Sequence, residues 1–432
     1  MPSGSSRAGR LRASVGELIG ADFAQKVVAT LGTRMLLVAV GLATSVLVAR
    51  SLGPEGRGLY AVAVALGAIG VQVTNLGLHA SNTWAVSREP KLLGSLIANS
   101  AVVSLAVGGG AALIAWFVLS SWPGLVDLPP ALLALGLLAI PIGLGYLLLQ
   151  NLLIGTGRIR EFNWIELLVR GVSVASLAAV IIVGAVSPFL ALLAGVVGSV
   201  AGVVACVIAF ARRLDLRTRP SADLLRAYAR YGLRAYVAAL FWFLVKRSDL
   251  LLVQHFRGSA DAGYYSIAAT MADLVYMIPV VVGMLLFPRL SAMTDESRKW
   301  WVASRMAVLV GAVMAGVAVV AALLADSAIS ILFGNEYLPA VPAFLLLLPG
   351  IVMLSVSTIL MNYGAAIGMP TITWLAPLIG LALNVTLNLS LIPAFGIVGA
   401  SASSTIAYGV VLVAGFVGFR LRIAERRAGR RG

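Results

Sequence analysis

Residues 188–211 read PFLALLAGVVGSVAGVVACVIAFA, and Arg212 and Arg213 follow directly. An α-helix needs about 20 apolar residues to cross the hydrocarbon core of a bilayer, and this uncharged stretch is long enough. The chain is 60% hydrophobic with a mean hydropathy of +0.99, so blocks of this kind make up most of it. The pattern predicts an all-α integral membrane protein with twelve transmembrane helices, at 27–49, 58–83, 93–119, 130–153, 164–186, 188–211, 230–254, 263–287, 303–324, 338–361, 372–392 and 397–419.

The basic residues are distributed unevenly between the two sides of this predicted bundle. Of the 32 Lys and Arg residues, 24 fall in segments on the side that holds both termini. Three more fall on the other side (Arg50, Arg57 and Arg257), and the remaining five lie within spans. Cytoplasmic connections carry such an excess of Lys and Arg, so both termini are predicted to be cytoplasmic. Most of the net charge of +15 would then lie against anionic lipid headgroups, and nucleic acid is not expected as a partner.

Similar residues recur in the two halves of the chain at nearly constant spacing. Gly53, Gly58 and Tyr60 match Gly258, Gly263 and Tyr265, and Asn151 and Gly157 match Asn362 and Gly368. Six spans in each half, running in the same direction, predict two parallel-repeat lobes with a cavity between them. The expected organisation is a basic cytoplasmic segment with an interfacial helix, a first lobe, a cytoplasmic linker, a second lobe and a basic cytoplasmic tail, at 1–26, 27–211, 212–229, 230–419 and 420–432. The interfacial helix of the first segment is expected to start near Ser14, and the linker is expected to hold another that starts at Ser221.

Charged residues within the spans are the candidates for function, because charge is costly in the membrane and usually faces a cavity. The five cations Arg34, Arg170, Arg234, Lys246 and Arg247 are therefore expected to line the cavity between the lobes and to bind an anionic substrate. For Arg234, near the inner end of the seventh span, the favoured alternative is that its side chain extends to the membrane interface. Guanidinium groups suit phosphate, since their planar fork offers paired donors.

Three acids accompany these cations, and each has two interpretations. Glu166 lies four residues before Arg170 and is expected either to pair with it or to share its cavity role. Asp249 and Asp273 are expected either to neutralise the cations of the seventh span or to bind a coupling ion. For Asp273 the structural pair is the favoured interpretation.

Polar side chains in two other spans are further cavity candidates. Gln72 and Asn75 lie in the second span, and Asn384 and Asn388 lie one helical turn apart in the eleventh. These groups are expected either to hydrogen-bond sugars or to hold helices together. Gly198 and Gly202 form a GxxxG pattern that predicts close helix packing.

Several classes of chemistry have no support in the sequence. No Walker A loop is present, and the two histidines, His79 and His255, are far apart and lack metal-ligand spacing. The single cysteine, Cys206, lies in an apolar span and is expected to be a packing residue. No catalytic residue, metal site or cofactor is predicted, and the chain is not expected to be an enzyme.

Five short motifs resemble those of a known family, in the same order along the chain. They are Arg50–Tyr60 (RSLGPEGRGLY), Thr74–Leu78 (TNLGL), Lys246–Asp249 (KRSD), Gly263–Tyr265 (GYY) and Leu391–Ala400 (LIPAFGIVGA). Together they resemble the polysaccharide biosynthesis (Wzx-type) oligosaccharide flippases of the multidrug/oligosaccharidyl-lipid/polysaccharide (MOP) exporter superfamily. The resemblance implies two six-helix lobes in a V shape. Asn75 stands where the family usually has an acid, so the resemblance does not extend to ion coupling there.

The resemblance also implies a function, namely moving undecaprenyl-diphosphate-linked oligosaccharide from the inner to the outer leaflet by alternating access. The expected setting is the cytoplasmic membrane of a bacterium, with the lipid-linked glycan, membrane lipids and polysaccharide polymerase or assembly proteins as partners. A lipid II flippase and a cation-coupled multidrug exporter of the same superfamily are the alternatives. Whether protons, sodium ions or the membrane potential drive the cycle is left open at this point.

Overall fold

The computed structural model describes residues 21–211 and 219–428, and the side chains of 21–34, 227–231, 234–235 and 426–428 also lie outside that description. The predicted interfacial helix near Ser14 therefore falls outside the described residues. Within them the chain forms helices joined by short connections: α2 (Ala21–Thr74), α3 (Leu78–Arg88), α4 (Leu93–Val103), the π-helical turn η2 (Ser104–Gly108), α5 (Gly109–Ser121), α6 (Pro130–Gly155), α7 (Ile159–Ile182), α8 (Pro188–Ala211), α9 (Ala222–Arg257), α10 (Ser259–Ala292), α11 (Glu296–Leu323), α12 (Ala325–Leu332), η4 (Asn335–Ala340), α13 (Val341–Ala366) and α14 (Ile372–Ala428).

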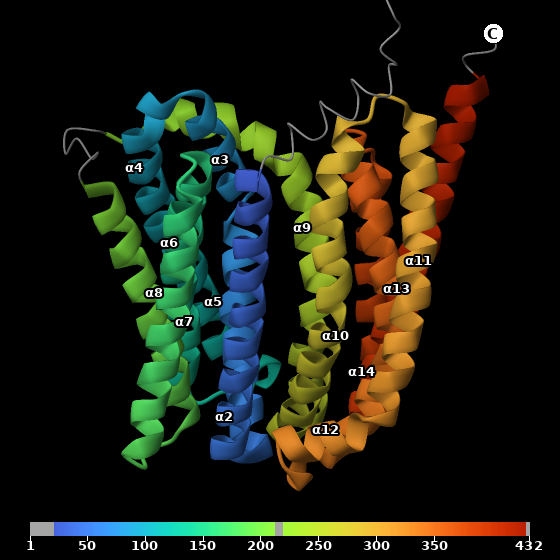
Figure 1. The fold of residues 1–432 in the computed structure, drawn as a ribbon. Coiled ribbons are helices and arrows are strands. Elements are labelled where there is room, and N and C mark those ends of the chain that lie inside the picture. Colours follow the sequence, from blue (N-terminus) through green and yellow to red (C-terminus); the bar gives the residue numbers. More distant parts are fainter. Residues whose placement is uncertain (1–20, 212–218, 429–432) are drawn as a thin grey trace, which may run out of the picture.

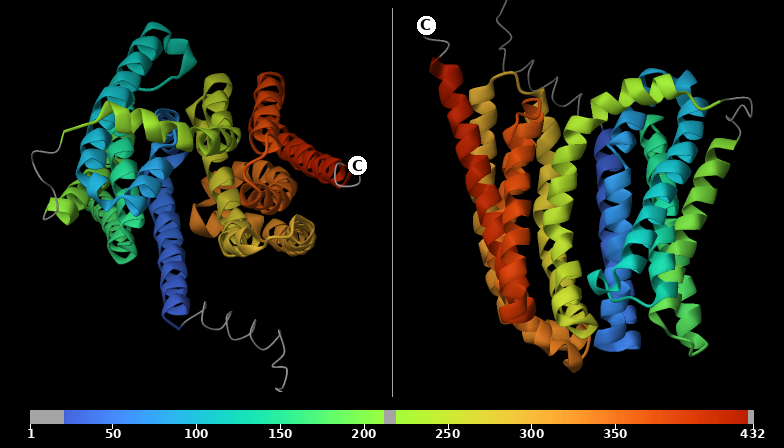
Figure 2. Two further views of the ribbon diagram at one scale, coloured as in Figure 1. Left: turned by 90° about the horizontal axis from the view of Figure 1, so that it is seen from above. Right: turned by 180° about the vertical axis from the view of Figure 1, so that it is seen from behind.

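The helices form two bundles that stand side by side (Figures 1 and 2). Helices α2–α8 make the first bundle, here called the N-lobe, and α9–α14 make the second, the C-lobe. The helix order alternates between two ends, and Arg88, Arg158, Arg289 and Arg420 all lie at one of them, which we call the basic end. The other is called the opposite end.

Nine helical stretches of the described chain are long and apolar enough to cross a membrane. Their outer surfaces are apolar, and Ile182, Val183 and Leu323 are each at least 79% exposed. Large exposed apolar surfaces of this kind are rare on soluble monomers and suit contact with lipid. The chain is therefore a multi-pass membrane protein, while the number of twelve spans and the cytoplasmic placement of the termini stay predictions.

Two of the nine stretches contain a sharp bend at a glycine. In α2 the bend lies at Gly53, with φ of 66° and ψ of 178°, and in α14 it lies at Gly396, with φ of 59°. Such positive φ values are readily adopted by glycine. Pro54 follows Gly53 directly and suits the first turn of the returning helix, where a missing N–H costs little. The chain thus turns back at the opposite end after a single glycine rather than through a loop.

The repeat read from the sequence recurs in the backbone geometry. Gly258 has φ of 86° and ψ of −179°, which is nearly the conformation of its counterpart Gly53. Gly157 and its counterpart Gly368 also share positive φ values, 76° and 89°. The matching asparagines, Asn151 and Asn362, each donate from the side-chain amide to the carbonyl four residues earlier, at 2.8 Å. Equivalent positions in the two halves therefore have similar backbone conformations and make the same local hydrogen bonds.

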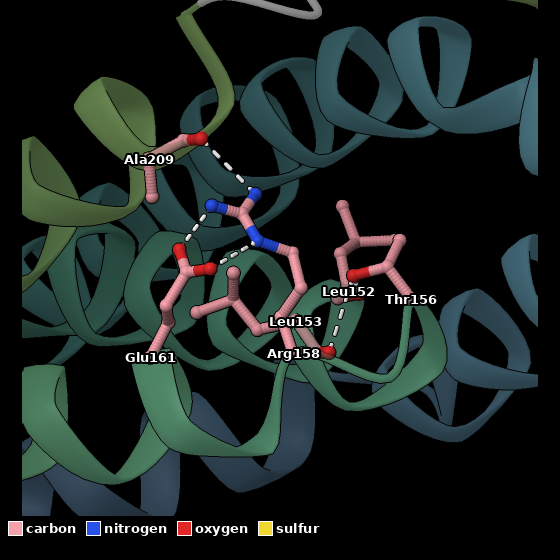
Figure 3. Close-up of polar contacts among 6 residues, drawn as sticks. All are labelled: Leu152, Leu153, Thr156, Arg158, Glu161 and Ala209. Atoms are coloured by element: carbon pink, nitrogen blue, oxygen red, sulfur yellow. Dashed lines mark hydrogen bonds and ion pairs between the residues drawn. The ribbon is translucent and has the colours of Figure 1, made fainter.

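Arg158, which lies in one of the predicted cytoplasmic connections, binds helices of the N-lobe to one another. Arg158, in the turn between α6 and α7, pairs with Glu161 and donates from Nη1 to the Ala209 carbonyl at 3.0 Å (Figure 3). Ala209 lies in the last turn of α8, where carbonyls lack helical partners and a cation is favourable. The guanidinium also lies 5.3 Å from the Phe210 ring centroid. Arg158 therefore joins α6, α7 and α8 at the basic end.

The connection between the lobes differs from the predicted separate linker helix. The predicted start at Ser221 is present, since its Oγ accepts from the Leu224 amide at 3.3 Å. From there the chain continues without a break as α9, whose first turns lie across the basic end of the N-lobe (Figure 2). Asn99 of α4 holds this start through two bonds to the Ser221 backbone, at 2.8 and 3.0 Å.

Candidate functional site

The central cavity lies between the two lobes and has a volume of about 520 Å³. That volume falls in the range of about 300–1,000 Å³ typical of small-molecule sites. Its walls come from α2 and α7 of the N-lobe and from α9 and α10 of the C-lobe. The lining residues extend along α2 and α10 from Arg57, near the opposite end, toward Leu37 and Met277.

Charged side chains from both lobes meet in this cavity. The N-lobe contributes Arg57, Glu166 and Arg170, and the C-lobe contributes Arg247 and Asp273. Three guanidinium groups against two carboxylates leave one net positive charge on the wall. The structure therefore brings four of the residues singled out in the sequence to one place. Arg170 lies three turns into α7 rather than one, because that helix begins at Ile159.

Asp273 joins two adjacent cations of α9, Lys246 and Arg247. Its Oδ1 lies 2.9 Å from the Lys246 ammonium and its Oδ2 lies 2.7 Å from Nη2 of Arg247. The expected ion pair between Asp273 and the seventh span is thus present, and both cations share it. Lys246 also lies 4.3 Å from the Tyr276 ring centroid, within the range of a cation–π contact. One carboxylate between two cations leaves this corner of the cavity net positive.

Arg57 is the cavity residue that the sequence assigned wrongly. Hydropathy starts the second span at residue 58, which leaves Arg57 in the preceding outer connection and outside the set of cavity candidates. Instead it lies in the first turn after the Gly53 bend and is only 6% exposed. Its Nε donates to Ser266 Oγ of α10 and its Nη2 to Ser45 Oγ of α2, both at 3.1 Å. Its guanidinium therefore bonds both lobes while lining the cavity.

The opposite end of the cavity is closed by backbone contact between the lobes. A Cβ atom on Gly58 would lie 1.7 Å from the Ser259 carbonyl oxygen, and one on Gly263 would lie 1.9 Å from the Pro54 carbonyl oxygen. Gly58 and Gly263 are counterparts in the repeat, so each lobe presents the same glycine to the other. Only residues without a side chain allow helices to approach this closely.

Hydrogen bonds surround this glycine contact. Tyr337 of the C-lobe donates to the Ala49 carbonyl at 2.8 Å, and the Gln254 amide donates to the Asp127 carbonyl at 2.6 Å. Arg50 donates to the last carbonyls of α12, those of Ile331 and Leu332, at 2.5 and 2.9 Å. A cation at a helix C-terminus is favourable. These bonds hold the lobes together at the opposite end.

Asp249 lies away from the cavity, inside the C-lobe, and is 3% exposed. It accepts hydrogen bonds from the Tyr265 hydroxyl, from Ser404 Oγ at 2.9 Å and from the Leu250 amide at 2.9 Å. The interpretation of Asp249 as the direct ion-pair partner of Lys246 or Arg247 is therefore wrong, because among the described contacts both cations bond to Asp273. A carboxylate buried this deeply needs such donors.

The two asparagines of the eleventh span belong to this same buried cluster rather than to the central cavity. Asn384 donates to Ser404 Oγ at 3.2 Å, and Asn388 donates to Asn384 Oδ1 at 3.0 Å. Both are fully buried. Within the described part of the chain, Asn388 Oδ1 and Ser401 Oγ are buried without a hydrogen-bond partner. The cluster thus gathers one carboxylate and several oxygens in an enclosed place.

The remaining candidates lie elsewhere. The predicted second span is interrupted after Thr74, and Asn75, in the turn before α3, accepts from the His79 amide at 3.3 Å. Gln72 is half-buried nearby, and neither residue is among the described residues that line the central cavity. Arg34 and Arg234 belong to α2 and α9, but their side chains fall outside the structural description.

Comparison with known proteins fits this geometry. The family model described as polysaccharide biosynthesis protein matches residues 47–342. The chain is 26% identical over 201 residues to the probable flippase AglR of Haloferax volcanii, covering 44% of this chain and 40% of that protein. The chain therefore aligns with about 40% of the length of the curated relatives that it matches.

Two solved structures share the fold. An inward-facing multidrug resistance MATE family transporter of the MOP superfamily superposes with a TM-score of 0.77 at 15% identity, covering 91% of this chain and 96% of that one. The lipid II flippase MurJ, in an inward closed conformation, superposes with a TM-score of 0.70 at 14% identity, covering 91% and 87%.

Two lobes that meet at a charged cavity within a membrane-spanning bundle are the fold that this chain shares with these two solved structures. The chain belongs to the polysaccharide biosynthesis protein family, because the family model matches more than half of its length. The resemblance to the Wzx-type flippases drawn from its motifs is thereby confirmed.

Proposed function

We propose that this protein is a flippase that carries undecaprenyl-diphosphate-linked oligosaccharide across a bacterial cytoplasmic membrane by alternating access. The observation that carries this proposal is the central cavity, into which both lobes project guanidinium groups. Arg57, Arg170 and Arg247 offer many N–H donors for a diphosphate, and phosphate oxygens are strong acceptors. The lipid tail would stay in the bilayer while the headgroup crosses.

The balance of charge suits release as well as binding. Glu166 and Asp273 offset two of the three guanidinium groups, so the wall has one net positive charge rather than three. A transporter must bind its cargo weakly enough to release it on the other side. A diphosphate would compete with Asp273 for Arg247 and Lys246, and its departure would let the ion pairs form again.

Orientation and conformation follow from the charge pattern and the closed end. We infer that the basic end faces the cytoplasm, since Lys and Arg accumulate on that side of membrane proteins. The glycine contact at Gly58 and Gly263 would then seal the cavity from the outside. The described conformation would be the one that accepts substrate from the inner leaflet.

The Asp249 cluster is our candidate for ion coupling. Hydrogen bonds through Ser404 and Asn384 link the Asp249 carboxylate to Asn388, whose Oδ1 is buried without a partner among the described residues. A proton or a sodium ion would relieve the desolvation of the carboxylate there. Asp249 lies two residues from Arg247 on α9, so a change at the ion site would shift that helix and reach the cavity.

A cation-coupled multidrug exporter is disfavoured by the same cavity. Three guanidinium groups repel a cationic drug, and two carboxylates already paired or shared with cations would bind it poorly. A lipid II flippase fits the cavity equally well, because lipid II also carries a diphosphate. The two substrates differ in their sugars.

A steric block of the cavity tests the proposal. Gly41 lines the cavity, and a Cβ built on it meets nothing within 4 Å, so Gly41→Leu has room for its first side-chain atom and adds bulk at the cavity wall. Gly316 of α11 is equally open, exposed and remote from the cavity, so Gly316→Leu is the matched control. In proteoliposomes, we expect Gly41→Leu to lower the rate at which a fluorescent polyprenyl-diphosphate-linked sugar changes leaflet by at least about tenfold. Equal rates in both variants would refute the central cavity as the route.

A further inference from the structure

A second hollow lies inside the N-lobe, which we call the N-lobe chamber. Its volume is about 330 Å³, and its walls come from α2, α6, α7 and α8. It shares five lining residues with the central cavity, Thr44, Tyr60, Val64, Glu166 and Arg170. The chamber therefore adjoins the central cavity and is an extension of it rather than a separate site.

The hydroxyl groups in its wall are arranged as acceptors. Thr44, Ser173 and Ser199 each donate their proton to the carbonyl four residues earlier, at 2.7, 2.9 and 3.1 Å. Their remaining lone pairs can only accept. Glu166 adds a carboxylate to the same wall. A ligand that uses these groups must bring its own hydrogen-bond donors, which an ionised diphosphate lacks.

Two groups can donate as well. Arg170 offers its guanidinium, and the Tyr146 hydroxyl is buried without a hydrogen-bond partner in the described part of the chain. Buried polar groups usually have partners, so an unmet hydroxyl beside a hollow points to a ligand. Glu166 and Arg170 balance in formal charge, and no other charged residue lines the chamber among those described.

Close packing keeps the chamber wall rigid. The GxxxG pattern of α8 lies directly behind it, as the sequence predicted. A Cβ on Gly198 would lie 2.6 Å from the Val169 carbonyl oxygen, and one on Gly202 would lie 2.7 Å from the Tyr146 ring. With no side chain at either glycine, α8 holds Tyr146 and the α7 wall in place. A preformed wall lowers the cost of ordering when a ligand binds.

We propose that the N-lobe chamber binds the sugar next to the diphosphate of the substrate, through its hydroxyl groups. Saccharide hydroxyls both donate and accept, which matches a neutral wall rich in acceptors with two donors. This inference rests on the proposed flippase function and divides the substrate between two places. The diphosphate lies against the central guanidinium groups and the first sugar enters the N-lobe. The chamber would then select which glycan is carried.

The test compares two probes on purified protein in lipid nanodiscs: farnesyl diphosphate, and farnesyl diphosphate that carries one N-acetylhexosamine. Gly195 lines the chamber, and a Cβ built on it meets nothing within 4 Å, so Gly195→Leu has room for its first side-chain atom and adds bulk at the chamber wall. Gly110 of α5 is equally open and lines neither hollow, so Gly110→Leu is the control. We expect Gly195→Leu to weaken binding of the sugar-bearing probe at least about tenfold and to leave the bare diphosphate within twofold.

A second variant, with no added side-chain volume, separates loss of a sugar contact from an indirect effect of the larger side chain in Gly195→Leu. Tyr146→Phe removes a single hydroxyl, and we expect a loss of about threefold to tenfold for the sugar-bearing probe alone, the size of one hydrogen bond. If Gly195→Leu weakens both probes equally, or neither, the chamber does not bind sugar and the inference is overturned.

The proposed function has a separate readout. Arg247→Ala should weaken both probes together, because it removes a diphosphate ligand from the central cavity. If Arg247→Ala changes neither probe while Gly195→Leu affects only the sugar-bearing one, the cationic cavity is wrong and the chamber stands.

Discussion

Replacing Gly58 with alanine should open the end of the molecule at which the two lobes now touch. Gly58 lies in a helix, where alanine is intrinsically favoured over glycine by about 1 kcal/mol. Its added Cβ would nevertheless fall 1.7 Å from the Ser259 carbonyl oxygen of the other lobe. The two effects have opposite signs, so the outcome reports on the contact between the lobes.

The size of the effect follows from the distances. Real Cβ atoms essentially never approach another heavy atom closer than 3.0 Å, so the lobes must separate here by at least 1.3 Å, the difference from 1.7 Å. A shift of that size breaks or stretches the bonds of Arg57 to Ser266 and of Tyr337 to Ala49. Bonds to charged groups contribute about 1.5–3 kcal/mol and neutral ones about 0.5–1.5. Losing about 2.8 kcal/mol would shift the closed-to-open ratio about a hundredfold.

Distances between spin labels measure this shift. Val183 and Leu323 are both 79% exposed, and they lie at the ends of α7 and α11 that reach the opposite end of the N-lobe and C-lobe. Cysteines at these positions, in a chain with Cys206→Ala, allow double electron–electron resonance in nanodiscs. We expect the main distance in Gly58→Ala to lengthen or a second, longer distance to dominate.

A matched control separates this effect from a general disturbance. Gly109 begins α5 and a Cβ built on it meets nothing within 4 Å, so Gly109→Ala should leave the distance distribution unchanged. If Gly58→Ala gives the distances of the parent protein and transports normally, the glycine contact is not the seal.

Three further outcomes are expected. Arg57→Ala should lower transport at least about tenfold, while Ser266→Ala, which removes the bond but keeps the cation, should lower it much less; equal losses would count against a substrate role. Asp273→Asn leaves Lys246 and Arg247 without their shared carboxylate and should lower the free energy of unfolding by about 3 kcal/mol. This is the smallest loss expected for breaking a buried ion pair, and we choose it because Asp273 is 32% exposed. Thermal unfolding checks this against Asp261→Asn, which breaks a single ion pair with Arg257, four residues away, and should cost under about 1 kcal/mol. Asp249→Asn should make the flipping rate insensitive to sodium and to a pH gradient, and a preserved ion response would remove Asp249 from coupling.

The sequence by itself determined the class of the protein and the course of its chain. Hydropathy adds up residue by residue, so a block such as 188–211 predicts a membrane helix whatever surrounds it. The helix α8 has those same bounds. The repeat and the family motifs are also local patterns, and Gly53 and Gly258 adopt matching conformations as their spacing suggested.

The sequence also identified much of the charge in the site, because a cation inside an apolar block is visible on inspection. Arg170 and Arg247 were found in this way, and both line the central cavity. Arg57 was missed because a Gly-Pro bend and a loop have the same local composition. Whether the chain reverses at Gly53 within one residue or through a longer loop depends on its packing against the other lobe.

Only the tertiary structure decided which of these groups meet. Helices in a membrane are apolar on all sides, so their sequences carry little information about which face turns inward. Asp249 and Asp273 look alike in the sequence, yet one is enclosed by Tyr265 and Ser404 and the other bridges two cations at the cavity. Their difference comes from contacts between α9, α10 and α14, whose distances no local pattern sets. The N-lobe chamber likewise exists only because four separate helices pack around it.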